Sequence, residues 1–223
     1  MIAYAVRNAR ELGVASHRHI YRMVGFFAAV LLIALGASRP AVAQGKWSLP
    51  DEAQPEFAEL VFEVARGELQ EWITDPVIIF AIREQNRTYE RISKFSIKKL
   101  DNEWVTGGSR GPMVGDLLGR QASVILRDRR ESSSGVITEI IVMDQHGLNV
   151  AISDPTSDFF QGDEAKYLET YLKGPGSVHV SELEFDESTQ LVQTQVSLSV
   201  TDPDSGDVIG AVTFGVNLEV LNN

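Results

Sequence analysis

The amino-acid sequence predicts an α+β fold in which long N-terminal helices pack on a five-stranded antiparallel sheet. Apolar residues recur at steps of three and four over a helical part, residues 51–128. From Ser132 onward the pattern changes to short runs of β-branched residues, and these predict a sheet part over 135–221. Because no internal repeat or low-complexity linker separates the two parts, residues 44–223 are expected to form a single domain.

Residues 1–43 have the composition of a secretory signal peptide. Four arginines precede the apolar run Met23–Ala37, and Ala41 and Ala43 supply the small residues of a cleavage site. The run of 15 residues is shorter than the roughly 20 that cross a bilayer as a helix. We therefore expect cleavage before Gln44 and a secreted, periplasmic protein. The alternative is an uncleaved membrane anchor.

The charge of the chain excludes several kinds of partner. The leader holds five of the 20 basic residues and one of the 31 acidic residues, which leaves 15 basic and 30 acidic residues in the mature chain. Nucleic-acid binding requires basic surface that neutralises phosphates, so no nucleic acid is expected as a partner. The chain has no cysteine, and this rules out disulfides, thiol nucleophiles and cysteine-ligated zinc.

The helical part divides at Asp75–Pro76, where aspartate suits an N-cap and proline suits the first helical position. Before it, apolar residues form the stripe of an amphipathic helix: Phe57, Leu60, Val61, Val64, Leu69, Trp72 and Ile73. After it, the apolar pattern continues a helix to about residue 104. The glycine-rich segment 107–112 ends that helix, and a short helix is expected over 114–128.

The sheet part begins with a strand over 136–143 and a hairpin turn, Asp144–Gly147, followed by a strand over 148–153. A loop at 154–162 and a short helix at 163–172 come next. Three strands close the chain: 177–186, 190–201 and 208–218, joined by turns at 186–189 and 202–207.

This order of elements resembles the extracytoplasmic PAS-like sensor domains of the Cache type, also called PDC. The resemblance covers about residues 51–221. Its most specific pieces are Val142–Val150, which is similar to the D-x-x-G hairpin of that family, and the closing strand that begins at Val208. The resemblance implies a long helix behind a PAS-like sheet, and a ligand pocket on the other face beneath a loop-and-helix lid.

The last two strands predict one apolar and one polar face, because side chains alternate along a strand. Val192 to Val200 and Val212 to Leu218 supply the apolar face, which we expect to meet the helices. The polar face then either lines a ligand pocket or meets solvent, as one side of many antiparallel sheets does. The polar residues assigned to ligand binding are Gln193, Gln195, Ser197, Thr213 and Asn217.

The loop and helix after the second strand are expected to form the lip of that pocket, with a lid over 153–166. Phe159 and Phe160 are adjacent aromatic residues in a polar loop, so they either wall the ligand or plug the core. Gln161 and Lys166 complete the predicted ligand-binding set, and Lys166 either meets an anionic ligand or is solvated.

The amino-acid-binding branch of the Cache family holds the amine of its ligand with an aspartate in the last strand. That position is Gly215 here, and the tyrosine–arginine–tryptophan signature of the branch is missing around Phe159. The resemblance therefore does not carry over a ligand.

Motifs of catalysis and metal binding lack their structural context. Gly107–Gly111 matches a nucleophile elbow, but a predicted helix and not a strand precedes it. Asp202–Asp207 begins like a calcium loop, but its glycine comes one place early and no glutamate follows at the twelfth position. After cleavage only His146 and His179 remain, and they are too isolated for a triad or a zinc site.

The sequence thus predicts a non-catalytic sensor domain, without cofactor or metal, that binds a small polar metabolite and signals through a partner. The alternative is a structural or interaction protein that keeps the PAS-like fold and binds no ligand. The apolar stripe extends nearly to the mature N-terminus, where a short sheet does not cover it. We therefore expect a homodimer or a membrane receptor to contact the helix at 52–65.

Overall fold

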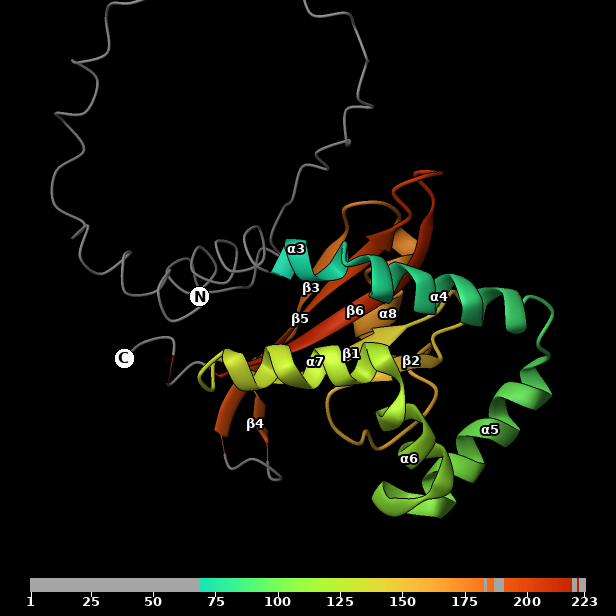
Figure 1. The fold of residues 1–223 in the computed structure, drawn as a ribbon, viewed down its shortest axis with the longest axis horizontal. Helices are drawn as coiled ribbons and strands as arrows, with labels where there is room; N and C mark the ends of the chain where they lie inside the picture. The colour runs from blue at the N-terminus through green and yellow to red at the C-terminus, as the bar shows by residue number, and fades with distance from the viewer. Residues whose placement is uncertain (1–68, 183, 187–190, 218–219, 221–223) are drawn as a thin grey trace, which may run out of the picture.

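The computed structural model describes residues 69–182, 184–186, 191–217 and 220. Helices cover one face of an antiparallel sheet, so the predicted α+β fold is confirmed (Figure 1). The leader, the helix at 52–65 and residues 187–189 of the predicted turn lie outside the described residues. Within the described stretches, no helix combines the length and the apolar composition that a membrane span requires.

The helices that cover the front of the sheet in Figure 1 are α3 (Gln70–Ile73), α4 (Pro76–Thr88) and α7 (Gln121–Ser132). Asp75 caps α4 as predicted, because its carboxylate accepts a hydrogen bond from the backbone N–H of Val77 (2.8 Å). Ile78, Ile79 and Ile82 recur on the inner face of α4 and are buried against the sheet.

Two of the predicted helices are each divided in the structure. The chain leaves α4 after Thr88 and restarts at α5 (Lys94–Gly107), where the Ser93 hydroxyl accepts from the backbone N–H of Ser96. The helix predicted over 114–128 is α6 (Pro112–Gly119) followed by α7, because Arg120 adopts an extended conformation between them. Helices α5 and α6 pack together and extend beyond the sheet (Figure 1).

The sheet contains six strands in five positions. The strands are β1 (Ile137–Met143), β2 (Asn149–Ile152), β3 (Val178–Val180), β4 (Glu184–Asp186), β5 (Leu191–Thr201) and β6 (Val208–Asn217). Their order is β2-β1-β6-β5-β3, and β4 pairs with another stretch of β5. The single strand predicted over 177–186 is therefore two short strands along the same neighbour, and the number of positions agrees with the predicted five.

The two faces of the sheet pack against different layers. Val196, Leu198 and Val200 of β5, with Val212, Phe214 and Val216 of β6, are buried against the helices in front. On the other face Ile141, Met143 and Ala211 pack against Trp104 of α5, Leu117 of α6 and the 154–162 loop. The sheet is therefore buried on both faces, and the predicted apolar side of β5 and β6 lies against the helices.

The helix predicted over 163–172 is shorter than expected. The structure has a single turn, α8 (Ala165–Leu168), followed by a 3-10 turn, η3 (Tyr171–Lys173). Glu169 and Thr170 leave the helical conformation between them. Helix α8 packs on β5 and β6 behind the sheet, on the face opposite α4 (Figure 1).

Candidate functional site

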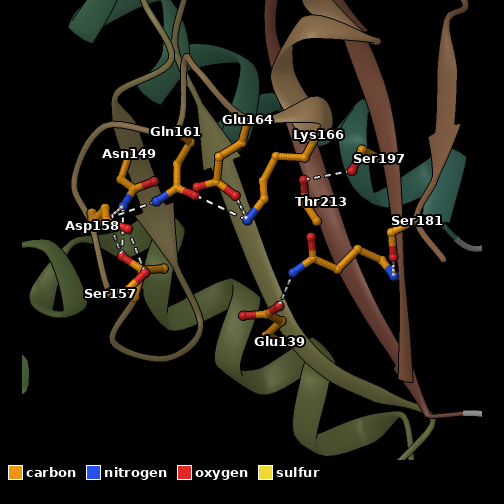
Figure 2. A network of polar contacts seen from close by, with 12 residues as sticks. Glu139, Asn149, Ser157, Asp158, Gln161, Glu164, Lys166, Ser181, Ser197 and Thr213 are labelled. Carbon is orange, nitrogen blue, oxygen red and sulfur yellow. Dashed lines mark hydrogen bonds and ion pairs between the residues drawn. The ribbon is translucent and has the colours of Figure 1, made fainter. Parts of the chain in front are cut away.

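Ser197 and Thr213 form the centre of the polar face, which consists of Gln193, Gln195, Ser197, Thr213 and Asn217. They are directly opposite each other on β5 and β6, and their hydroxyl oxygens are 3.0 Å apart (Figure 2). Both side chains are fully buried. Burying a hydroxyl is costly unless it is hydrogen-bonded, and the bond between Ser197 and Thr213 gives each hydroxyl one partner.

The next row of the polar face joins three strands. Gly215 of β6 lies between Gln195 of β5 and Glu139 of β1. The Gln195 amide donates a hydrogen bond across it to the Glu139 carboxylate (2.9 Å; Figure 2). A Cβ atom on Gly215 would lie 2.8 Å from Cγ of Glu139 and 2.3 Å from the hydroxyl of Thr138. The contact between Gln195 and Glu139 therefore depends on a glycine at 215.

Glu139 contacts the polar face and is a candidate site residue that the sequence analysis missed. An available signal was its place in β1, because it shares a face with Ile141 and Met143, which pack on the polar side of the sheet. Thr138 also reaches this side, since a bulge lies between Ile137 and Glu139, and its hydroxyl donates to Gln193 (2.8 Å). Gln193 and Asn217 are opposite each other and buried.

The 154–162 loop is held in place from two sides. Its residue Phe159 is buried, with its ring 5.4 Å from the ring of Trp104, and Trp104 donates to the backbone carbonyl of Thr156 (2.9 Å). The backbone N–H groups of Phe159 and Phe160 both donate to the carboxylate of Asp101 on α5 (2.9 and 3.0 Å). Phe159 is therefore packed in the core, the position expected if it anchors the loop as an aromatic plug.

The same loop is bonded to the edge of β2. The backbone N–H of Asn149 donates to the carbonyl of Phe159 (3.0 Å), and the N–H of Gln161 donates to the carbonyl of Gly147 (2.7 Å). Gly147 has a φ of 77°, and a Cβ there would lie 2.4 Å from the backbone of Gly162. This close backbone contact explains why a glycine ends the Asp144–Gly147 turn.

Lys166 points from α8 toward the loop (Figure 2). Its ammonium group lies 3.2 Å from the amide oxygen of Gln161 and 3.1 Å from the carboxylate of Glu164, and only 11% of its side chain is exposed. Lys166 is therefore largely buried and paired within the protein, which differs from the predicted alternative of a solvated lysine.

The helix that carries Lys166 is linked to the β1–β2 turn. Tyr167 is buried, donates its hydroxyl hydrogen to the backbone carbonyl of Gln145 (2.6 Å) and stacks on Tyr171 with ring centroids 5.0 Å apart. Burial raises the pKa of Tyr167, so its hydroxyl remains a donor at physiological pH. The backbone N–H of Gln145 donates in turn to the side chain of Asn86 on α4 (2.9 Å).

Asp144 fixes this turn from inside. Its carboxylate is fully buried and accepts from the backbone N–H groups of His146 (2.7 Å) and Leu148 (3.0 Å) and from the amide of Gln85 on α4 (3.0 Å). Burial raises the pKa of Asp144 above its ordinary value of 3.8. The predicted D-x-x-G hairpin is therefore a turn whose aspartate is buried and bonded to a helix.

Two surface hollows lie along α5, away from the polar face. The larger has a volume of about 710 Å³ and includes Phe95, Lys98 and Asn102, and the smaller, about 470 Å³, includes Tyr89 and Ile92. Neither hollow is lined by a residue of the predicted ligand-binding set.

The remaining motifs occupy ordinary structural positions. Gly107–Gly111 ends α5 and forms a 3-10 turn, so no strand precedes its serine. The 202–207 segment is the turn between β5 and β6, in which the backbone N–H of Gly206 donates to the carbonyl of Asp202 (2.9 Å). In the described part of the chain, no group of three or more His, Asp or Glu residues is placed to hold a metal ion.

No protein-family model and no curated protein matches the chain. Among the solved structures to which the chain is similar are sensory domains of chemoreceptors and histidine kinases. They include the sensory domain of the Campylobacter jejuni chemoreceptor Tlp3 with isoleucine bound (14% identity, 76% of this chain and 66% of that one, TM-score 0.37). They also include the sensor domain of the V. cholerae histidine kinase DctB (11% identity, 72% of this chain and 59% of that one, TM-score 0.35). The sensor domain of E. coli DcuS is a third example (17% identity, 58% of this chain and 96% of that one, TM-score 0.33). The chain spans less than two thirds of the length of the Tlp3 domains.

Proposed function

We propose that the protein is an extracytoplasmic sensor domain that binds a small polar metabolite between the polar face and α8. The observation that carries the proposal is the burial of Gln193, Ser197, Thr213 and Asn217 on one face of β5 and β6, in the two rows that flank Gln195 and Gly215. Apolar side chains would stabilise a purely structural interface more simply, because buried polar groups gain little net free energy even when they are bonded. A cluster of amide and hydroxyl groups suits the recognition of a polar ligand.

Two charged contacts beside the polar face are suited to exchange with a ligand. Lys166 bonds Gln161 and Glu164, and Gln195 bonds Glu139. A ligand with an acceptor group would take the place of Gln161 at the lysine, and a ligand with a donor group would bond both the carboxylate of Glu139 and the amide oxygen of Gln195. Each arrangement keeps a charge-assisted hydrogen bond, so neither leaves a partly buried charge unpaired.

The signal would leave the site through the β1–β2 turn. A ligand that shifts α8 moves Tyr167, whose hydroxyl bonds the carbonyl of Gln145, and the N–H of Gln145 bonds Asn86 of α4. A ligand that favours one position of α8 would thereby favour one position of α4. The partner that receives the signal, a second copy or a membrane receptor, would contact the 52–65 helix upstream of α3.

The test of ligand binding is a thermal-shift screen of the exported protein against carboxylates, amino acids, purines and polyamines. A compound present at a hundredfold excess over its Kd stabilises the folded state by about 2.7 kcal/mol. Gln195→Leu should abolish the shift, whereas Gln121→Leu, an exposed change on α7, should leave it unchanged. A normal response of the Gln195 variant would place the site elsewhere.

The second candidate function is an interaction protein without a ligand. The observation that favours it is that Ser197 and Thr213, Gln195 and Glu139, and Lys166 and Gln161 already bond each other. If no compound in the screen stabilises the protein and Gln195→Leu raises its stability, the polar face is a structural network and the sensor proposal is wrong.

A further inference from the structure

Within the described residues, the outer face of helix α5 is exposed and has no packing partner. Its inner face packs through Ile97, Leu100 and Trp104 into the cluster behind the sheet. On the outer face the side chain of Phe95 is 80% exposed, the largest exposed fraction among the exposed large hydrophobic residues of the described chain, and it borders the 710 Å³ hollow. An exposed aromatic residue beside a hollow is typical of a surface that binds another protein.

This face is basic, although the chain as a whole has a net charge of −11. Arg91 precedes α5, and Lys94, Lys98 and Lys99 follow on its exposed side. Lys99 forms a long, exposed ion pair with Glu103 (3.6 Å). Within the described residues, Arg91, Lys94 and Lys98 form no ion pair. The outer face of α5 therefore complements an acidic segment that also carries apolar side chains.

The chain itself contains such a segment upstream of α3. Residues 51–68 hold six acidic residues and one basic residue. If the segment is a helix, as its apolar spacing predicts, the steps of three and four place Glu56, Glu59 and Glu63 in one row. The stripe formed by Phe57, Leu60, Val61 and Val64 lies on that same helix. An acidic row and an apolar stripe match the lysines and the exposed Phe95 of α5.

The direction of the chain favours the segment of a second copy. The backbone of Leu69 already has helical dihedral angles (φ −66°, ψ −37°), and no side chain among the described residues caps α3 there. A helix over 51–68 would therefore continue α3 on the side away from α4. Helix α5 follows the opposite end of α4 (Figure 1). The acidic segment of one copy would thus run away from its own α5.

We propose that the protein forms a homodimer in which the 51–68 segment of each copy docks on the outer face of α5 of the other. The exchange is reciprocal, so the two contacts close a symmetric dimer and leave no open surface for further copies. The proposal is independent of the ligand site. It selects the second copy as the partner of the upstream helix and names the surface that receives it.

The test is sedimentation velocity of the protein purified after export, at low and at high salt. The wild-type protein should sediment as a dimer at low salt and shift toward monomer at high salt, because ions screen exposed charge pairs. The basic face is reversed in Lys94→Glu/Lys98→Glu and the acidic row in Glu59→Lys/Glu63→Lys. Each variant alone should sediment as a monomer, since like charges then face each other in both contacts.

Mixing the two charge-reversed variants should restore the dimer. In the mixed pair the native acidic segment meets the native α5, and the basic segment meets the acidic α5, so both contacts regain opposite charges. Lys173→Glu, an exposed change on η3, should leave the dimer intact. Circular dichroism of each variant checks that it is folded. A monomeric wild-type protein, dimeric single variants or a mixture that stays monomeric would each overturn the proposal.

Discussion

The hydroxyl of Tyr167 donates to the backbone carbonyl of Gln145 at 2.6 Å, and this bond is a direct link between α8 and the β1–β2 turn. The backbone N–H of the same residue, Gln145, donates a hydrogen bond to the side chain of Asn86 on α4. Two helices on opposite faces of the sheet therefore meet at one residue of a tight turn.

Tyr167→Phe should weaken this link and leave the fold intact. Loss of one hydrogen bond should lower the free energy of unfolding by about 0.5–1.5 kcal/mol, measured by urea denaturation. Tyr171→Phe is the matched control, because the Tyr171 hydroxyl makes no hydrogen bond within the described residues. If both variants lose the same stability, the hydroxyl of Tyr167 does not carry the link.

The buried carboxylate of Asp144 should make stability fall as pH rises. The pKa of Asp144 is raised in the folded state, so above pH 3.8 the folded state binds more protons than the unfolded state. The stability that this carboxyl group contributes is therefore lost as pH rises from 3.8 to the raised pKa of the folded state. In Asp144→Asn an amide would face the amide of Gln85, so the variant should be less stable.

The variant lacks the titrating group, so its deficit in the free energy of unfolding should narrow as pH rises from below 3.8 toward neutrality. Urea denaturation across that pH range measures both proteins, and the titration of all other groups cancels in the difference. A deficit that is constant with pH would mean that Asp144 has no raised pKa.

Gly215→Ala should disturb the polar face directly. The added methyl group would lie 2.3 Å from the hydroxyl of Thr138 and 2.8 Å from Cγ of Glu139, so one of these side chains must move. Overpacking of this kind costs about 1–3 kcal/mol in the free energy of unfolding. Gly115→Ala on α6 is the control, because a Cβ there contacts nothing within 4 Å. If the two variants were equally stable, the close contacts of Gly215 with Thr138 and Glu139 would be contradicted.

The leader should be removed on export. We expect N-terminal sequencing of the exported protein to begin at Gln44, because Ala41 and Ala43 fit the signal-peptidase site. A full-length product that pellets with membranes would instead support the uncleaved anchor.

The sequence predicted those parts of the fold whose signals are local. Asp75–Pro76 begins α4 as expected, and Asp144–Gly147 forms the expected turn, because capping and turn residues act within a few positions. The division at Arg120 was missed, because the apolar spacing continues from Leu117 to Leu126 across the one extended residue between α6 and α7. The same holds for the interruption between Val180 and Glu184, where two strands share one neighbour.

The candidate site was only partly predictable. Alternation placed Ser197 and Thr213 on one face, but their direct pairing depends on the register of β5 and β6. Glu139 belongs to a strand whose only other polar residue is Thr138, and its contact with Gln195 requires a third strand, β6, between them. Likewise the partners of Lys166 depend on how the loop folds back, which is not encoded at the position of the lysine itself.

Both margins of the sheet are poor templates for the addition of another strand. At the β2 margin, the backbone of Phe159 and Gln161 already occupies hydrogen-bonding groups of Asn149 and Gly147. At the other margin, β3 and β4 are only three residues long each and are interrupted between Val180 and Glu184. Short or covered edge strands resist edge-to-edge aggregation. Even at high local concentrations, copies of this chain should therefore not assemble into extended β-structure through the described sheet.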